Sequence, residues 1–222
     1  TWMPHFFKQV NSEDLESVKR TDQEIHAIVS YLFDRSESFK MEKMQNKGNA
    51  DNGRMLVNSI GCLGCHATEG EEQVALKSVN SMRREHGPNL INLGSKTTQK
   101  WIYNWIRDPQ SYHSGTKMPN LRLSKEEASD ISAYLIGQRD KDFEKNPRPE
   151  VDENGINLIA SDLLSSILRK DEVKARLGSM SLDQKLNYVG GKLIRHYGCF
   201  SCHDIDGFED AKPIGTPLST EA

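Results

Sequence analysis

Two copies of one cysteine–histidine pattern constrain this chain more than any other feature. The chain has four cysteines, and all of them lie in the pattern C-x-x-C-H, at Cys62-Leu63-Gly64-Cys65-His66 and at Cys199-Phe200-Ser201-Cys202-His203. Two thiols at this spacing can form thioethers to the two vinyl groups of one haem, and the histidine that follows can supply an axial imidazole to its iron. The pattern therefore predicts two covalently attached haem c groups, with His66 and His203 as iron ligands.

Three other interpretations of the cysteines explain less of the pattern. A disulfide would pair two cysteines but would leave the histidine that follows them unexplained. A thioredoxin-like redox motif requires a preceding strand in a βαβ unit, and a four-cysteine zinc site would have to join two widely separated pairs. Haem attachment accounts for all four cysteines and both histidines. Covalent haem c is assembled outside the cytoplasm, so we expect a periplasmic or otherwise extracytoplasmic protein.

The composition agrees with a core that protein side chains fill only in part. Of the 222 residues, 36% are hydrophobic, and the mean hydropathy is -0.68, whereas globular domains are usually more apolar. No stretch approaches the roughly 18 consecutive apolar residues that would predict a transmembrane helix. The formal net charge of -3 gives no reason to expect nucleic-acid binding.

The sequence before the two motifs repeats. Gly53, Leu56, Val57, Ile60 and Gly61 precede the first motif, and Gly190, Leu193, Ile194, Tyr197 and Gly198 precede the second at the same spacings. The apolar positions predict an amphipathic helix before each motif. Glycine inside a helix costs roughly 1 kcal/mol relative to alanine, so Gly53 and Gly190 predict close packing against another helix.

A second repeat carries a methionine. Thr116-Lys117-Met118-Pro119 is followed by Ser124-Lys125-Glu126-Glu127, and Thr1-Trp2-Met3-Pro4 is followed by Thr21-Asp22-Gln23-Glu24. The same helical pattern of apolar residues comes after both of the later tetrads. Both of these tetrads have the form of a capping box, so a helix is expected to begin at each one.

Residues 48–139 carry these elements in one continuous order. A helix leads into the first C-x-x-C-H motif, and a Gly-Pro-Asn-Leu loop follows at 87–90. A helix containing Trp101 and Trp105 comes next, and then Lys-Met-Pro at 117–119 and a final helix. This order resembles a complete class I c-type cytochrome domain, of the mitochondrial-cytochrome type.

The resemblance implies a set of haem-binding residues in this region. His66 is the expected proximal ligand of the iron, and Met118 is the expected distal ligand. The carbonyl of Pro88 is expected to orient the Nδ1 proton of His66. Trp101 and Trp105 are expected to wall the haem pocket, and an indole N–H could reach a haem propionate.

Two further regions resemble halves of the same type of domain. Residues 1–40 resemble the methionine-bearing half, and residues 181–222 resemble the haem-attachment half. Residues 140–180 are expected to form a linker and a connector helix. We therefore expect an all-α fold of tandem cytochrome c domains, one complete domain at 48–139 and two half-domains, joined by a helical linker.

Met3 is the expected distal ligand of a haem, because its Thr-x-Met-Pro context repeats that of Met118. That haem is either a third one, attached by a motif in a longer parent protein, or the second one, at Cys199 and Cys202, in an exchange of half-domains. Few residues follow Leu218, and this spacing favours two different haems in a longer parent over exchange.

The expected function is electron transfer, and no catalytic residue is predicted. Haems with His/Met ligation, which raises the reduction potential relative to bis-His ligation, would relay single electrons between redox partners of a respiratory chain, or within a larger respiratory complex. The alternative is a dihaem cytochrome c peroxidase-like enzyme. Such an enzyme also carries two C-x-x-C-H motifs, but it needs one haem with an open sixth position.

Overall fold

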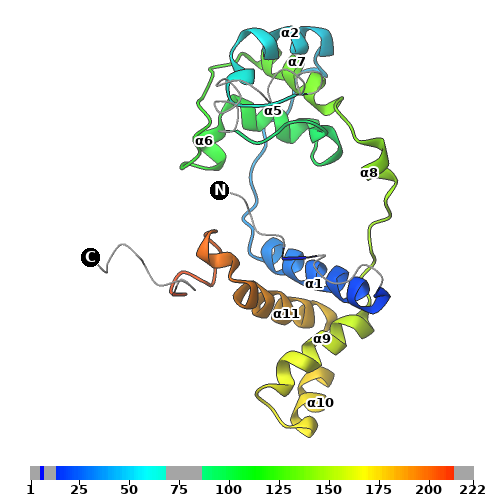
Figure 1. The fold of residues 1–222 in the computed structure, drawn as a ribbon. Coiled ribbons are helices and arrows are strands. Elements are labelled where there is room, and N and C mark those ends of the chain that lie inside the picture. Colours follow the sequence, from blue (N-terminus) through cyan, green and yellow to red (C-terminus); the bar gives the residue numbers. More distant parts are fainter. Residues whose placement is uncertain (1–5, 8–13, 69–86, 213–222) are drawn as a thin grey trace, which may run out of the picture. The chain divides into compact units, whose positions relative to one another are not determined.

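The computed structural model describes residues 6–7, 14–68 and 87–212, and every regular element in these ranges is helical (Figure 1). The predicted all-α fold is thereby confirmed. The chain divides into two compact units, which we call the central unit (Ser38–Pro147) and the terminal unit (Thr1–Glu37 with Arg148–Ala222). No helix within the described ranges combines the length and the apolar character that crossing a membrane requires.

The central unit contains the region that resembles a cytochrome c domain. Its elements are α2 (Ala50–Ser59), the 3-10 turn η1 (Cys62–Gly64), η3 (Leu93–Ser95), α5 (Gln99–Arg107), α6 (Pro109–Tyr112), α7 (Lys125–Ile136) and α8 (Lys141–Lys145). Helices α2 and α5 both pack against α7. The buried apolar side chains of this core are Val57, Ile102, Tyr103, Ile106, Ala128, Ile131 and Leu135.

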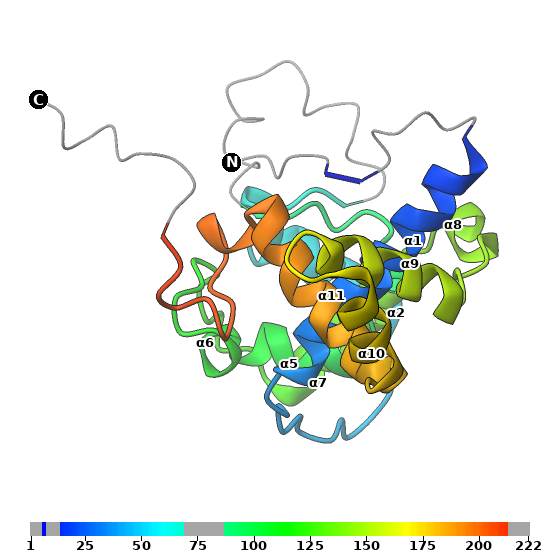
Figure 2. The same ribbon diagram turned by 90° about the horizontal axis from the view of Figure 1, so that it is seen from below.

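The terminal unit is built from both ends of the chain. Its elements are α1 (Leu15–Asp34), α9 (Glu153–Ser165), α10 (Lys170–Gly178), α11 (Leu182–Tyr197) and the 3-10 turn η4 (Cys199–Ser201). Helix α1 packs along α11, α9 packs against both of them, and α10 lies beside α9 (Figures 1 and 2). The main core consists of Ala27, Ile156, Ile159, Ala160, Leu186, Val189 and Leu193. Segments far apart in the sequence therefore share one core.

A glycine lies at the closest approach of the main helix pair in each unit. A Cβ atom on Gly53 of α2 would overlap the backbone carbonyl of Asp130 on α7. A Cβ atom on Gly190 of α11 would overlap the backbone carbonyl of Ala27 on α1. The predicted close packing of both glycines is confirmed.

These two crossings use equivalent positions of the sequence repeats. Asp130 lies six residues after Ser124, and Ala27 lies six residues after Thr21, the equivalent first residue of the other tetrad. Each glycine lies nine residues before the first cysteine of its motif. The pair α1 and α11 therefore has the same register as the pair α7 and α2.

The predicted helix start at Thr21 is wrong, whereas the one at Ser124 is confirmed. Ser124 forms a reciprocal capping box with Glu127. Helix α1 begins earlier, because the carboxylate of Asp14 accepts hydrogen bonds from the backbone N–H groups of the first turn. Thr21 lies inside α1, and its hydroxyl donates to the carbonyl oxygen of Ser17 at 3.0 Å. The helix therefore begins after the Asp14 cap and continues through Thr21, where its start was predicted.

The region expected to hold a linker and one connector helix is more segmented than predicted. The short helix α8 lies in the expected linker, and its N-cap is Asp140. The expected connector is two helices, α9 and α10, with a break between Ser165 and Lys170. The break arises because α10 has an N-cap of its own. The Glu172 carboxylate accepts a hydrogen bond from the backbone N–H of Arg169 at 2.9 Å.

Candidate haem sites

The first attachment motif forms a tight turn after α2. Gly61 has a φ of +96°, which residues with a side chain rarely adopt. The backbone N–H groups of Cys65 and His66 both donate to the carbonyl oxygen of Cys62, at 3.2 and 3.0 Å. Cys62 is half-buried and Cys65 is exposed, and burial raises the pKa of the Cys62 thiol. The turn thereby holds two free thiols and the imidazole within one short segment.

The loop at 87–90 is fixed against this motif. The backbone N–H of Gly87 donates to the carbonyl oxygen of Cys65 at 3.0 Å, and that of Leu90 donates to Ala67 at 2.9 Å. A Cβ atom on Gly87 would lie 2.6 Å from Cε1 of His66, so only glycine fits beside the imidazole. The sequence predicted the loop but not this role of Gly87. The Gly-Pro dipeptide could have indicated it, because the loop was expected to contact His66.

The imidazole of His66 is oriented by the same loop. Its Nδ1 lies 2.7 Å from the carbonyl oxygen of Pro88. A carbonyl oxygen only accepts hydrogen bonds, so Nδ1 carries a proton, and in the neutral imidazole the lone pair then lies on Nε2. This is the contact that the resemblance implied for Pro88, and ligation of iron by His66 stays a prediction.

Met118 lies against the core that also contacts the attachment turn. Met118, Cys62 and Leu63 all pack against the buried cluster of the central unit. The indole Nε1 of Trp105 donates a hydrogen bond to the sulfur of Met118, with the two atoms 2.9 Å apart. The tryptophan N–H therefore points at the predicted iron ligand, whereas a haem propionate was the partner that we suggested from the sequence.

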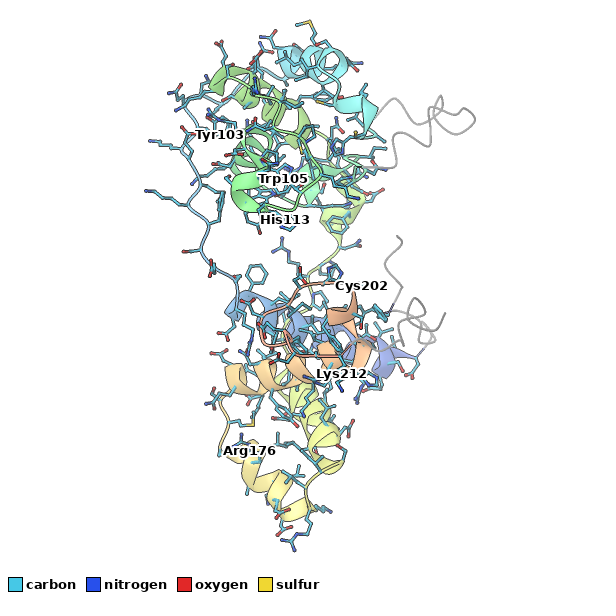
Figure 3. All side chains as sticks on the ribbon, turned by 90° about the vertical axis from the view of Figure 1, so that its left-hand side faces the viewer. Tyr103, Trp105, His113, Arg176, Cys202 and Lys212 are labelled. Carbon is cyan, nitrogen blue, oxygen red and sulfur yellow. The ribbon has the colours of Figure 1, made fainter. Side chains whose placement is uncertain are left out.

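An aromatic cluster surrounds the two tryptophans. The ring centroids of Trp101 and Tyr112 are 4.5 Å apart, and those of Trp105 and Tyr112 are 5.9 Å apart. Phe39 adds an edge-to-face contact with Tyr112, at 5.1 Å between centroids. Trp101 thus packs mainly among aromatic rings, and its predicted contact with haem stays a prediction. Sequence reasoning missed Phe39 and Tyr112, because neither lies in a recognisable motif. Figure 3 shows Trp105 on the ribbon of the central unit.

The second motif repeats the backbone geometry of the first. Gly198 ends α11 with a φ of +69°. The backbone N–H groups of Cys202 and His203 donate to the carbonyl oxygen of Cys199, at 3.2 and 3.0 Å. Cys199 is half-buried, with its thiol pKa raised by burial, and Cys202 is exposed (Figure 3). His203 is exposed.

Aromatic residues from both ends of the chain lie around the second motif. The rings of Phe200 and Phe208 stack at 5.5 Å between centroids, and Tyr31 of α1 contacts Phe208 edge to face at 5.9 Å. Phe6 and Phe7 contact Tyr197, at 5.6 and 5.3 Å between centroids. The predicted ligand Met3 lies outside the described residues, as does the chain after residue 212.

A hydrogen bond joins the end of α11 to α1. The hydroxyl of Tyr197 donates to the carboxylate of Glu24 at 2.8 Å. Burial, followed by the hydrogen bond and the negative charge of Glu24, raises the pKa of Tyr197 to about 12. Tyr197 therefore stays neutral over the ordinary pH range, directly before the turn that carries Cys199.

The residues of the central unit fit a covalently bound haem. Two free thiols at the required spacing, an imidazole with Nδ1 engaged, and a soft thioether are the donor set of a c-type haem with His/Met ligation. The absence of a side chain at Gly87 keeps the space beside the imidazole clear. The second motif offers the same thiols and imidazole.

Comparison with known protein families finds one family model that matches part of the chain. Residues 50–138 match the family model of cytochrome c. The match supports a c-type cytochrome, and the family implies covalently bound haem c and haem-based electron transfer. Proteins with this domain are typically electron carriers rather than enzymes.

One curated relative is the cytochrome c oxidase subunit 2 of Alkalihalophilus pseudofirmus. It is 30% identical over 95 residues, which cover 39% of this chain and 25% of the relative. The chain therefore spans about a quarter of the length of that protein. No solved structure matches the chain.

Proposed function

We propose that this protein is an electron carrier whose first haem, attached to Cys62 and Cys65, has His66 and Met118 as its axial ligands. The observation that carries this proposal is the packing of Cys62 and Met118, from two distant segments, against one apolar core. The hydrogen bond from His66 to Pro88 supports it as well, because it leaves Nε2 available to a metal ion.

Each side chain has a separate role in this site. The bound haem supplies reversible one-electron chemistry. The cysteines hold the group in place, and the Pro88 carbonyl keeps the proton of His66 on Nδ1. The thioether of Met118 is a soft ligand, and its pairing with histidine gives a higher potential than two histidines give. The apolar core beside them limits the access of water, which is a further influence on the potential.

A second haem is proposed in the terminal unit, on Cys199 and Cys202, with His203 as its proximal ligand. The matching backbone hydrogen bonds of the two motifs support this assignment. The equivalent register of the two helix crossings supports it independently. The protein would then be a multi-haem cytochrome with tandem haem units, one in the continuous central unit and one on the haem-attachment half at 181–222.

Met3 is the proposed distal ligand of a haem, either the second one or one attached by a further motif. The packing of α1 on α11 and the contacts of Phe6 and Phe7 with Tyr197 support the second haem. Met3→Ala is expected to change the spectrum of the haem that Cys199→Ala/Cys202→Ala removes. Unchanged spectra for every haem would refute Met3 as a ligand.

The proposed location is periplasmic or otherwise extracytoplasmic, with redox proteins of a respiratory chain, or of a larger respiratory complex, as partners. The name of the relative, a cytochrome c oxidase subunit, supports a respiratory role. Nucleic acid is not a proposed partner.

Absorption and EPR spectra of the ferric protein test this function. Electron carriers with His/Met ligation give low-spin, six-coordinate iron and the weak sulfur-to-iron absorption band. A high-spin haem with an open position, together with turnover of hydrogen peroxide, would instead favour the dihaem peroxidase-like alternative and contradict the proposal.

A further inference from the structure

We propose that residues 38–47, which we call the strap, hold the Met118-bearing segment in place, and that Glu42 is the positioning residue of the strap. The strap lies between α1 and α2, outside residues 50–138 that match the cytochrome c family. The Met118-bearing segment comprises residues 108–124, between the end of α5 and the start of α7. The inference rests on the proposed function, because it assumes that Met118 is the distal ligand of the first haem.

One side chain of α5 binds the backbone of Glu42 through two hydrogen bonds. The N–H of Glu42 donates to Oδ1 of Asn104 at 2.7 Å. The carbonyl oxygen of Glu42 accepts from Nδ2 of the same side chain at 3.1 Å. The side-chain amide thus exchanges both bonds with one residue, as a paired residue does in an antiparallel sheet. These two bonds fix the strap on α5 at Glu42.

The carboxylate of Glu42 contacts cationic residues at both ends of the Met118-bearing segment. One oxygen lies 3.8 Å from Nη1 of Arg107, the last residue of α5. The other oxygen forms an ion pair with Nζ of Lys125, the first residue of α7. The hydrogen bond from Lys125 and the charge of Arg107 hold the pKa of Glu42 below its usual range. One ionised side chain therefore bridges the helices that precede and follow the segment.

Two further contacts hold the strap on either side of this anchor. The ring of Phe39 meets the ring of Tyr112 edge to face, at 5.1 Å between centroids. The carbonyl oxygen of Lys47 accepts a hydrogen bond from the side-chain amide of Gln99 on α5 at 2.7 Å. Tyr112 belongs to the Met118-bearing segment, so the strap contacts this segment itself as well as the helices at both of its ends.

The consequence for the haem depends on what must move when the methionine leaves the iron. Another ligand can take the distal position only when the Met118-bearing segment shifts away from the core. Contacts that hold the segment disfavour this shift, and the loss of a contact raises the population of the open state. The strap is therefore expected to protect a His/Met haem from external ligands without supplying a ligand itself.

Imidazole binding to the ferric full chain tests this role, because imidazole competes with the methionine for the distal position. The sulfur-to-iron band is followed as imidazole is added, and the part of the signal that Met118→Ala lacks reports the first haem. Glu42→Gln keeps the shape of the side chain and removes its charge. Exposed ion pairs contribute modestly, so we expect the apparent affinity for imidazole to rise about two- to five-fold, with the band retained when imidazole is absent.

Two further variants separate the ion pair from a general effect of charge. Lys125→Gln breaks the same pair from the other side, so the double variant with Glu42→Gln should bind imidazole little more tightly than either single variant. Glu126→Gln is the matched control, because Glu126 lies on the same first turn of α7 and forms no ion pair among the described residues. An unchanged affinity in Glu42→Gln, or an equal rise in Glu126→Gln, would overturn the proposal.

Hydrogen exchange of the unmodified full chain tests the strap without any variant. After correction for intrinsic rates, the amide of Glu42 is expected to exchange more slowly than that of Lys43, whose N–H finds no acceptor in the described part of the chain. Equal and fast exchange at both amides would overturn the proposal, because the strap would then not be held on α5. Failure of the ligand assignment is read separately, from a sulfur-to-iron band that survives in Met118→Ala.

Discussion

His66 donates a hydrogen bond from Nδ1 to the carbonyl oxygen of Pro88 across 2.7 Å. This contact fixes the tautomer and the direction of the imidazole before any metal is bound. The loop can approach so closely because Gly87 has no side chain, and because its backbone N–H is tied to Cys65. The same loop thus orients the imidazole of His66, the expected proximal ligand, and packs closely beside it.

Gly87→Ala is expected to weaken this site. The added Cβ would lie 2.6 Å from Cε1 and 2.7 Å from Nδ1 of His66, and overpacking of this kind costs about 1–3 kcal/mol. We expect a lower free energy of unfolding in guanidinium chloride. Gly178→Ala is the control, because a Cβ added there would meet no atom of the described residues within 4 Å beyond its own helix. Equal stability of the two variants would contradict the account of the loop.

Met118→Ala is expected to abolish the sulfur-to-iron band of the ferric protein and to lower the potential of one haem. The reason is that a stabilising thioether ligand is lost while the attachment cysteines remain. Met55 is 63% exposed on α2, so Met55→Ala is the matched control and should keep the band. Persistence of the band in Met118→Ala would show that another residue holds the distal position.

Gly190→Ala is expected to separate α1 from α11. Its Cβ would overlap the backbone carbonyl of Ala27, and backbone atoms cannot move aside as a flexible side chain can. We expect a loss of roughly 1–3 kcal/mol in the free energy of unfolding, measured by circular dichroism in urea. Lys192→Ala, at an exposed position of the same helix, should remain within about 0.5 kcal/mol of the parent. A fully stable Gly190→Ala would refute the packing of the two helices.

Tyr197 is expected to make stability fall at alkaline pH. Its pKa is raised to about 12, first by burial and then by Glu24, whereas an unfolded tyrosine titrates near 10. The folded state therefore holds the phenol proton more tightly than the unfolded state does. The stabilisation that Tyr197 contributes to the free energy of unfolding is complete below about pH 10 and is lost as the pH rises through about 12.

The measurement is unfolding in urea at several pH values. Tyr197→Phe should flatten the fall in stability above about pH 10, because no phenol remains to titrate at that position. Tyr112→Phe, at a side chain that is 51% exposed, should retain the fall. A parent protein with constant stability from about pH 10 to 12 would contradict the assignment.

The sequence allowed the local elements to be predicted better than their partners. The duplicated motif and the periodicity before it indicated two helices that each end in an attachment turn, and Gly53 and Gly190 indicated close helix crossings. The partner of Gly190 could not be read from the sequence, because a helix crossing depends on which surface a distant segment covers. In the structure, α1 packs on α11.

Side-chain partners were harder still to predict. The acceptor of the Trp105 N–H depends on the path of the chain through the Lys-Met-Pro segment, and spacing along a helix does not define that path. Helix α1 begins early because its N-cap is Asp14, which lies seven residues before the tetrad at Thr21 from which the start was predicted. In both cases, the outcome depends on a side chain that lies outside the sequence motif used for the prediction: Met118 for the Trp105 N–H and Asp14 for the start of α1.

The intact mass of the denatured full chain tests the central claim most directly. Thioethers survive denaturation, so the account predicts a mass that exceeds the polypeptide by two haems. Cys62→Ala/Cys65→Ala and Cys199→Ala/Cys202→Ala should each lose one haem. A mass equal to the bare polypeptide, or to the polypeptide with zinc, would contradict the assignment of both motifs, and a single haem would contradict the second.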